Sequence, residues 1–214
     1  MGYVMDYWKI QDFLETLVPP RHAVVQRMEE EARADDFPII GPVSGQVCYL
    51  MARLIGAQRV FELGSGYGYS TAWFAQAVRE NGGGAIWHVV WDKELSQRAQ
   101  AHLQAMGLDD LVHYHVGEAI EKLTQTPGPF DIIFMDIDKV GYPVALPHIR
   151  ARLRPGGLLI VDNMLWDGRI ADENEREPET EAIRTLALAV ARDPAWTSII
   201  VPVRDGVLVA RFNG

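Results

Sequence analysis

Two short polar segments hold the residue types most able to do chemistry, because each directly follows a run of apolar residues. Asp136 and Lys139 follow one run, and Asp162 and Asn163 follow another. Hard oxygen donors without His or Cys suit Mg²⁺, with Ca²⁺ or Mn²⁺ as further candidates. Mg²⁺ commonly keeps waters that two adjacent hydroxyls of a substrate can replace. These segments therefore predict a divalent-metal site that accepts a vicinal diol.

Lys139, three residues after Asp136, is a candidate general base for the same site. A phenol with a pKa of about 10 is mostly protonated at neutral pH, so its oxygen needs activation before it attacks a methyl sulfonium. A metal stabilises the oxyanion, and a nearby amine takes the proton. The alternative interpretation of Lys139 is an exposed lysine after a strand. Its acidic and amide neighbours favour the catalytic one.

A glycine-rich turn from Gly64 to Gly68 follows a third apolar run and predicts a nucleotide-type site. Its G-x-G-x-G spacing differs from the dinucleotide fingerprint G-x-G-x-x-G. Glu62 adds a carboxylate that would repel a pyrophosphate but suits the ammonium and sulfonium charges of S-adenosylmethionine. The alternative for Glu62 is a strand-end residue that caps backbone amides. Ser70 either caps the following helix or holds the carboxylate of the cofactor.

Two further strand ends are predicted to contact a nucleoside. Asp92 ends the second apolar run, where a carboxylate can accept both hydroxyls of a ribose, whether from NAD or from S-adenosylmethionine. Backbone groups at Ala119, after the third predicted strand, are candidates to meet the edge of an adenine.

Short apolar runs that alternate with helical stretches must position all these residues. The runs are 60–63, 86–90, 112–116, 132–135 and 158–161, and the helical stretches lie near 71–80, 95–106, 119–123, 142–153 and 180–192. Alternation of this kind predicts βαβ units and a parallel sheet covered on both faces. Residues 154–157 are predicted as a turn, and 198–203 with 206–212 as a hairpin. The fold class is therefore α/β, a Rossmann-like seven-stranded mixed sheet with helices on both faces and a C-terminal antiparallel hairpin.

The organisation along the chain favours one domain over residues 1–214. Helices predicted over 6–18, 22–34 and 43–55 form an N-terminal extension, residues 1–56, before a core over 57–214. The charged segment 166–181 is predicted to be a mobile loop that closes over substrate.

Composition excludes several classes of protein. The net charge of −9 disfavours nucleic acid as a partner. No apolar run approaches the roughly 20 residues that span a bilayer, so we expect no membrane insertion. Neither a disulfide nor a secretory signal is predicted, since Cys48 is the only cysteine and Met1–Lys9 lacks a signal pattern. A cytoplasmic location is the expectation.

Five segments together resemble the cation-dependent O-methyltransferases, the group of class I S-adenosylmethionine-dependent methyltransferases that contains catechol O-methyltransferase and caffeoyl-CoA O-methyltransferase. The similarity extends from about Ile39 to Phe212 and follows the family's order. The segments are Phe61–Thr71, Phe134–Tyr142, Arg154–Gly157, Asp162–Gly168 and Pro202–Gly206.

The resemblance implies methyl transfer to a hydroxyl of a small catechol-like or caffeoyl-type acceptor, with S-adenosylmethionine as donor and a divalent cation. It implies metal ligands at Asp136, Asp162 and Asn163 and a catalytic base at Lys139, beside Asp136. The cofactor contacts that it implies are Ile40, Glu62, Gly64, Ser65, Ser70, Asp92, Ala119, Asp136 and Asp138, and the substrate contacts are Trp166 and Asp167. The family is often dimeric, so a homodimer is expected, with the N-terminal helices as candidate interface.

The sequence departs from the family at several positions of the site. Asp167 stands where the caffeoyl-CoA enzymes usually have Asn, so their substrate is not carried over. Ser44 replaces a common acidic residue, and Val90-Trp91 is bulkier than usual. These differences alter the expected pocket rather than the chemistry.

Two other functions remain open. An NAD-dependent oxidoreductase would bind a nicotinamide and would not need the oxygen cluster. A non-catalytic cofactor-binding module would not need Asp136, Lys139, Asp162 and Asn163 together.

Overall fold

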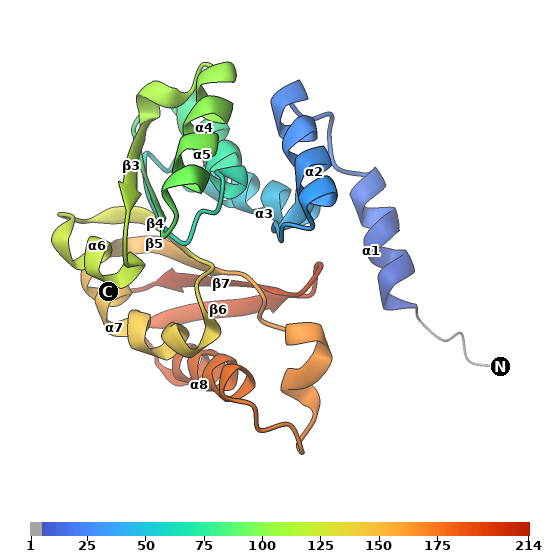
Figure 1. The fold of residues 1–214 in the computed structure, drawn as a ribbon. Coiled ribbons are helices and arrows are strands. Elements are labelled where there is room, and N and C mark those ends of the chain that lie inside the picture. Colours follow the sequence, from blue (N-terminus) through green and yellow to red (C-terminus); the bar gives the residue numbers. More distant parts are fainter. Residues whose placement is uncertain (1–5) are drawn as a thin grey trace.

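A seven-stranded sheet forms the centre of the computed structural model, which describes residues 6–214 (Figure 1). The strands are β1 (Arg59–Leu63), β2 (Ala85–Val90), β3 (Val112–Val116), β4 (Phe130–Met135), β5 (Leu153–Val161), β6 (Trp196–Val201) and β7 (Val207–Phe212). Their order is β3-β2-β1-β4-β5-β7-β6, with β1 to β5 parallel and β7 antiparallel to both β5 and β6. The predicted mixed α/β sheet with its C-terminal hairpin is confirmed.

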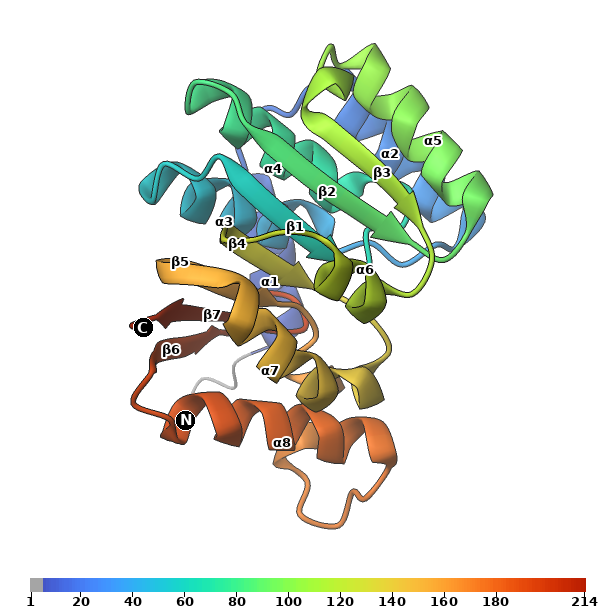
Figure 2. The ribbon, with the colours of Figure 1, turned by 90° about the vertical axis from the view of Figure 1, so that its left-hand side faces the viewer.

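Helices cover both faces of this sheet (Figure 2). They are α1 (Tyr7–Thr16), α2 (Ala23–Asp35), α3 (Gly41–Leu54), α4 (Tyr69–Glu80), α5 (Lys93–Ala105), α6 (Ala119–Gln125), α7 (Tyr142–Arg152) and α8 (Pro178–Arg192), with short 3₁₀ turns η1 (Asp109–Leu111), η2 (Lys139–Gly141) and η3 (Trp166–Ala171). Helices α2 to α5 pack on one face, and α6 to α8 pack on the other. Successive strand residues point to opposite faces, so Val60 joins the first core and Phe61 joins the second.

Strand β5 begins earlier than the sequence predicts. Residues 154–157 were predicted as a turn, whereas the structure includes them in β5. Leu153 already pairs with Phe130, and the register shifts before Ile132 pairs with Leu158. Gly156, at φ +78°, permits this irregularity, because a bulge absorbs extra residues without ending the strand.

The order of the strands creates the place for a site. From β1 the chain proceeds through β2 and β3 toward one edge of the sheet, and it then returns to add β4 and β5 on the other side of β1. In open α/β sheets, ligands bind beyond the carboxyl ends of the strands at such a reversal. The segments after β1 and β4 therefore border the expected site.

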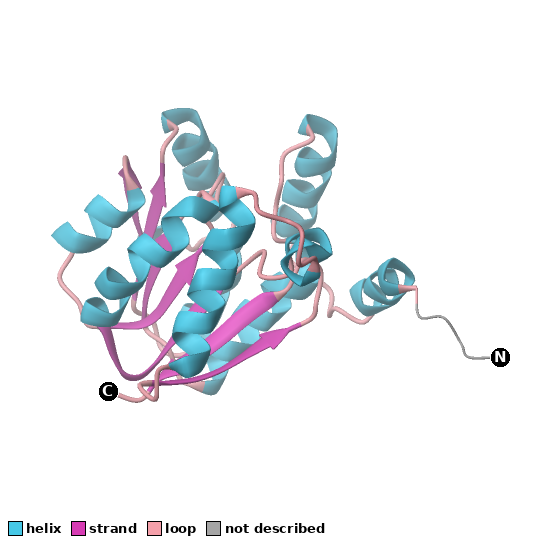
Figure 3. Cartoon of the chain, turned by 90° about the horizontal axis from the view of Figure 1, so that it is seen from below, coloured by secondary structure: helices cyan, strands magenta, loops and turns pink. Residues whose placement is uncertain are grey.

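Helix α1 lies at the periphery, beside the turn between β6 and β7 (Figure 3). Tyr7 Oη donates to Arg204 O at 2.6 Å, and Arg204 N donates to Gln11 Oε1 at 2.7 Å. Exposed side chains of α1 include Trp8 and Phe13. The first five residues of the predicted 1–56 extension lie outside the described residues.

None of the helices in residues 6–214 combines the length and apolar character needed to cross a bilayer.

Candidate active site

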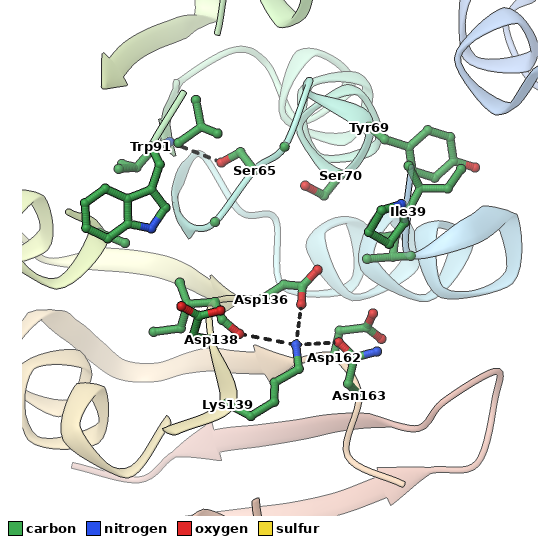
Figure 4. A pocket seen from close by; sticks show the side chains of 18 of the residues that line it. Ile39, Ser65, Tyr69, Ser70, Trp91, Asp136, Asp138, Lys139, Asp162 and Asn163 are labelled. Atoms are coloured by element: carbon green, nitrogen blue, oxygen red, sulfur yellow. Dashed lines mark hydrogen bonds and ion pairs between the residues drawn. The ribbon is translucent and has the colours of Figure 1, made fainter. Parts of the chain in front are cut away.

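A cavity of about 1110 Å³ opens at the carboxyl ends of the central strands. Its walls come from the glycine-rich loop after β1, the ends of β2, β4 and β5, the connection between α2 and α3, η3, and the first residues of α8. Figure 4 shows Trp91 on one side of this cavity and Ile39 on the other, with Asp136, Lys139 and Asn163 grouped between them, in the segments that follow β4 and β5.

The side chain of Lys139 lies at the centre of the polar group. Its Nζ donates to Asp136 Oδ1 at 2.9 Å, to Asn163 Oδ1 at 2.7 Å and to Ile137 O at 3.2 Å (Figure 4). The Lys139 side chain is only 11% exposed. A carboxylate oxygen and an amide oxygen from two different strands thus converge on one positive centre.

Backbone pairing beyond the strand ends brings these oxygens together. Asp136 N donates to Leu63 O at 2.8 Å, and Asp162 N donates to Met135 O at 3.2 Å. These bonds extend the ladders β1–β4 and β4–β5 by one residue. Asn163 then adopts a left-handed backbone at φ +58°, a conformation that Asn tolerates better than most residues.

Asp162 is the most strongly perturbed acid of the cluster. It is 5% exposed, and burial, followed by the charge of Asp136, raises its pKa to about 8. Two carboxylates are therefore held close together, with Lys139 and Arg204 as compensating charges. A cation bound among Asp136, Asp162 and Asn163 would reduce the repulsion between the two carboxylates. The hard oxygen atoms of these side chains fit Mg²⁺. Within residues 6–214, no group of three or more His, Cys, Asp or Glu side chains forms a metal site, so the candidate site depends on the amide of Asn163.

A second buried acid lies on the cofactor side of the cavity. Glu62 is completely buried and accepts hydrogen bonds from Ser70 Oγ at 2.5 Å and Thr71 Oγ1 at 2.6 Å. Burial raises its pKa to about 7, and the hydroxyl donors oppose that shift. His88 Nδ1 lies 3.1 Å from Thr71 Oγ1. Because the threonine hydroxyl donates to Glu62, the imidazole nitrogen donates to the hydroxyl.

The glycine-rich loop packs directly against the acidic cluster. A Cβ on Gly64, at φ +83°, would lie 2.2 Å from Asp136 O. Only glycine fits there, since any side chain would meet backbone rather than a movable group. Ser65 Oγ accepts from Val89 N at 3.1 Å and ties the loop to β2. The predicted cofactor loop and the predicted metal cluster are therefore direct neighbours.

Most of the residues predicted for the site line this cavity. They are Ile40, Gly64, Ser65, Ser70, Ala119, Asp136, Asp138, Lys139, Asp162, Asn163 and Trp166. Three predicted residues do not line it: Glu62, Asp92 and Asp167. Glu62 lies beneath Ser70, one layer below the surface of the cavity.

The side chains of Asp92 and Asp167 lie outside the cavity lining for different reasons. Asp92 Oδ1 accepts from Leu95 N at 2.9 Å and caps α5, while the neighbouring Trp91, 68% exposed, borders the cavity. Asp167 is exposed, and its backbone N–H donates to Asp205 Oδ1 at 2.7 Å.

Several residues at the site received no predicted role. Arg169, Glu177 and Glu179 line the cavity from η3 and the start of α8; they lie within the segment 166–181 that was predicted to close over substrate, but none of them was singled out. Asp205 accepts from Asn163 Nδ2 at 3.2 Å, and burial raises its pKa. Asp205 belongs to the segment Pro202–Gly206, one of the five that resemble the family, so the sequence contained a signal for its role at the site.

Comparisons with known proteins agree with one another. A family model described as O-methyltransferase matches residues 21–212. A catechol O-methyltransferase of Niastella koreensis is 36% identical over 179 residues, covering 82% of this chain and 79% of that protein. Among solved structures, the O-methyltransferase TomG from Streptomyces achromogenes, involved in tomaymycin synthesis and in complex with S-adenosylmethionine, has a TM-score of 0.86 and 25% identity, covering 99% of this chain and 100% of that one. A putative O-methyltransferase from Klebsiella pneumoniae has a TM-score of 0.84 and 27% identity, covering 96% and 97%.

Proposed function

This chain belongs to the O-methyltransferase family and uses S-adenosylmethionine, and from that premise we propose that it methylates one hydroxyl of a small catechol-like or caffeoyl-type acceptor with the help of a divalent cation. The observation that carries the proposal is the convergence of an Asp136 oxygen and an Asn163 oxygen on the ammonium of Lys139, beside the glycine-rich loop. The catechol O-methyltransferase of Niastella koreensis supports a catechol-like acceptor.

The proposed metal ligands are Asp136, Asp162 and Asn163. Their oxygens suit Mg²⁺ best, with Ca²⁺ or Mn²⁺ as alternatives. When bound, the cation stabilises negative charge on the acceptor oxygen, and the donor supplies an electrophilic methyl group. Asp205 orients Asn163 by accepting from its amide nitrogen, which leaves the amide oxygen directed at the cluster.

Lys139 is the proposed proton acceptor. Its Nζ lies within hydrogen-bond distance of both Asp136 and Asn163, so a hydroxyl held by the same oxygens would be within its reach. Trp166, whose ring centroid lies 5.7 Å from Nζ, is proposed as a wall for the flat ring of the acceptor. Asp167 stays a proposed substrate contact, although its exposed side chain would have to turn toward the cavity to reach the acceptor.

The cofactor is proposed to lie over the glycine-rich loop. Helix α4 begins without a side-chain cap, so its first backbone amides, among them that of Ser70, are free to bind the carboxylate of the donor. Glu62, held under Ser70, supplies negative charge below the positively charged end of the donor. The further contacts that we propose are Ile40, Gly64, Ser65, Ala119, Asp136 and Asp138, while Asp92 contributes at most a weak contact because its Oδ1 already caps α5.

The remaining assignments are also proposals. Residues 1–214 act as one methyltransferase domain, with 1–56 as an extension and 57–214 as the catalytic core. A homodimer would cover the apolar side chains of α1, such as Trp8 and Phe13. The acidic net charge of −9 favours a small molecule over nucleic acid, and we expect a cytoplasmic protein without membrane partners.

One assay tests the proposal. Catechols, flavonoids and caffeoyl esters are incubated with labelled S-adenosylmethionine, with Mg²⁺ or with a strong chelator. We expect label on an acceptor hydroxyl only with the metal. Full activity in the chelator would contradict the metal role, and equilibrium dialysis that detects NAD rather than S-adenosylmethionine would contradict the proposed reaction.

A further inference from the structure

The backbone that carries Trp166 is strained. Trp166 and Asp167 have φ of +49° and +52°, and Gly168 follows at +82°. Left-handed backbone at a bulky residue is strained and persists only where the surroundings impose it. Two hydrogen bonds to Asp205 hold the start of η3. The backbone oxygen of Asp205 accepts from Leu165 N, and its carboxylate accepts from Asp167 N, both at 2.7 Å.

On the side that follows η3, the guanidinium of Arg184 supplies the restraint. Arg184 reaches out from α8 and is 19% exposed. Its Nε donates to Ile170 O at 3.0 Å, its Nη1 to Glu175 O at 2.8 Å and to Glu181 Oε1 at 2.5 Å, and its Nη2 to Arg169 O at 3.0 Å and to Asp172 O at 2.5 Å. Arginine has five N–H donors in a fixed fork, so every donor of Arg184 has an acceptor.

Little else fixes this segment. Trp166 and Ile170 pack against the core, whereas residues 171–174 and 176–178 are exposed. The other hydrogen bonds of residues 172–177 are local, such as Asp172 Oδ1 accepting from Asn174 N, apart from a 3.5 Å contact of the exposed Arg176 with Glu181 on α8. From residue 171 to residue 177 the segment therefore has a polar centre, the Arg184 guanidinium, in place of a hydrophobic one.

The same segment borders the acceptor side of the cavity. Trp166 and Arg169 line it at one end of the segment and Glu177 lines it at the other. The guanidinium carbon of Arg169 lies 5.6 Å from the centroid of the Trp166 ring, which joins two of these lining side chains. A shift of the carbonyls at 169 and 170 would therefore move the wall beside Lys139.

We infer that Arg184 is a positioning residue for the methyl acceptor: its guanidinium gathers four backbone carbonyls of residues 169–175 and so holds Trp166 and Arg169 as one wall of the acceptor site. The inference rests on the proposed function for the identity of the acceptor. Lysine cannot replace this role, because its three donors lack the planar fork. The mobility of segment 166–181 stays a prediction, and the inference adds an anchor for that segment at Arg184.

The test uses the full chain with three substitutions. Arg184→Ala removes the fork, Arg184→Lys keeps the charge, and Arg192→Ala is the matched control, since Arg192 lies on the same helix and makes no side-chain hydrogen bond or ion pair with the described residues. For Arg184→Ala we expect the KM of a catechol acceptor to rise about tenfold while the Kd of S-adenosylmethionine stays within about twofold. Arg184→Lys should resemble Arg184→Ala. Added guanidinium ion should lower the KM of Arg184→Ala and leave the wild type and Arg192→Ala unchanged.

Hydrogen exchange provides the second measurement and needs no turnover. Exchange over 166–177 should accelerate in Arg184→Ala and Arg184→Lys, with the strands unaffected. Unchanged exchange would overturn the inference, as would faster exchange without a change in acceptor KM, or an equal loss of cofactor and acceptor affinity. If the wild type methylates no tested acceptor, the proposed function fails separately, and the exchange data still judge the anchoring role of Arg184.

Discussion

The two sides of the cavity treat a buried acid in opposite ways. On the cofactor side, burial raises the pKa of Glu62 to about 7, and the neutral hydroxyls of Ser70 and Thr71 oppose that shift. On the acceptor side, burial and then the like charge of Asp136 raise the pKa of Asp162 to about 8. Neutral donors complete the first environment within the chain, whereas in the second a bound cation would offset the repulsion between the two carboxylates.

The backbone shows the same contrast. Left-handed positions in the cofactor loop are glycines, such as Gly64 and Gly66, which adopt them without strain. On the acceptor side, non-glycine residues adopt them, among them Asn163 and Trp166. Strain at non-glycine residues is expected where a site is held in a functional geometry. The buried acid of the cofactor side thus has its hydrogen-bond partners within the chain. The acceptor side depends on a cation to offset its carboxylates and on Asp205 and Arg184 to hold its backbone.

The largest effect should come from removing the acid that defines the acceptor side. Asp162→Ala should lower metal-stimulated turnover by about 10²–10³-fold, because one of three oxygen ligands is lost. The Kd of S-adenosylmethionine should stay nearly unchanged, as measured by calorimetry. Asp162→Asn, which keeps the volume of the side chain, separates charge from packing. A parallel loss of cofactor binding in both variants would break the distinction between the two sides.

Lys139→Ala should lower the methyl-transfer rate by about 100-fold, since the proposed proton acceptor is removed. Part of the rate should return at high pH, where the phenol ionises without help. Single-turnover kinetics across pH measures both effects and separates them from product release. An unchanged rate would leave Lys139 as an ion-pair partner of Asp136 and nothing more.

Glu62→Gln should change how stability depends on pH in the cofactor-free protein. The pKa of Glu62 is raised from 4.5 to about 7, so the folded state binds its proton more tightly than the unfolded state does. Its contribution is complete below pH 4.5 and is lost as pH rises to about 7, by at most about 3 kcal/mol. Urea unfolding at several pH values should show this loss in the wild type only.

Asp162 adds a loss of the same sign in both proteins, from about pH 3.8 up to about pH 8, because its pKa is also raised. The difference between the wild type and Glu62→Gln therefore isolates Glu62. Equal pH profiles for the two proteins would show that Glu62 ionises normally, and the contrast between the two acids would disappear.

The smallest effect is expected at Asp92. Because its carboxylate caps α5, Asp92→Ala should cost about 1 kcal/mol of unfolding free energy and change the Kd of S-adenosylmethionine by less than about threefold. Asp92→Asn keeps the cap and provides the control. A tenfold loss of cofactor affinity in both variants would instead support the ribose contact that the sequence predicted.

The sequence by itself determined the order of elements and the location of the site. Alternating apolar runs specify the sheet because each strand must bury both faces, and polar residues directly after β4 and β5 must then appear at one edge. Gly64 could also be predicted from the sequence, because a sharp turn directly after a strand restricts which residue fits. The family resemblance, which the comparisons confirmed, depended on such local segments.

Only the tertiary structure decided how individual side chains are used. Asp92 and Asp167 have the residue types predicted for cofactor and substrate, but the cap of α5 binds the first side chain and the second points to solvent. Arg184 had no sequence signal, because its role depends on carbonyls from residues 9 to 15 positions earlier that approach it only when η3 folds back onto α8. Local patterns determine which residues reach an edge of the sheet, and competition among hydrogen-bond partners in three dimensions determines which of them remain free to act.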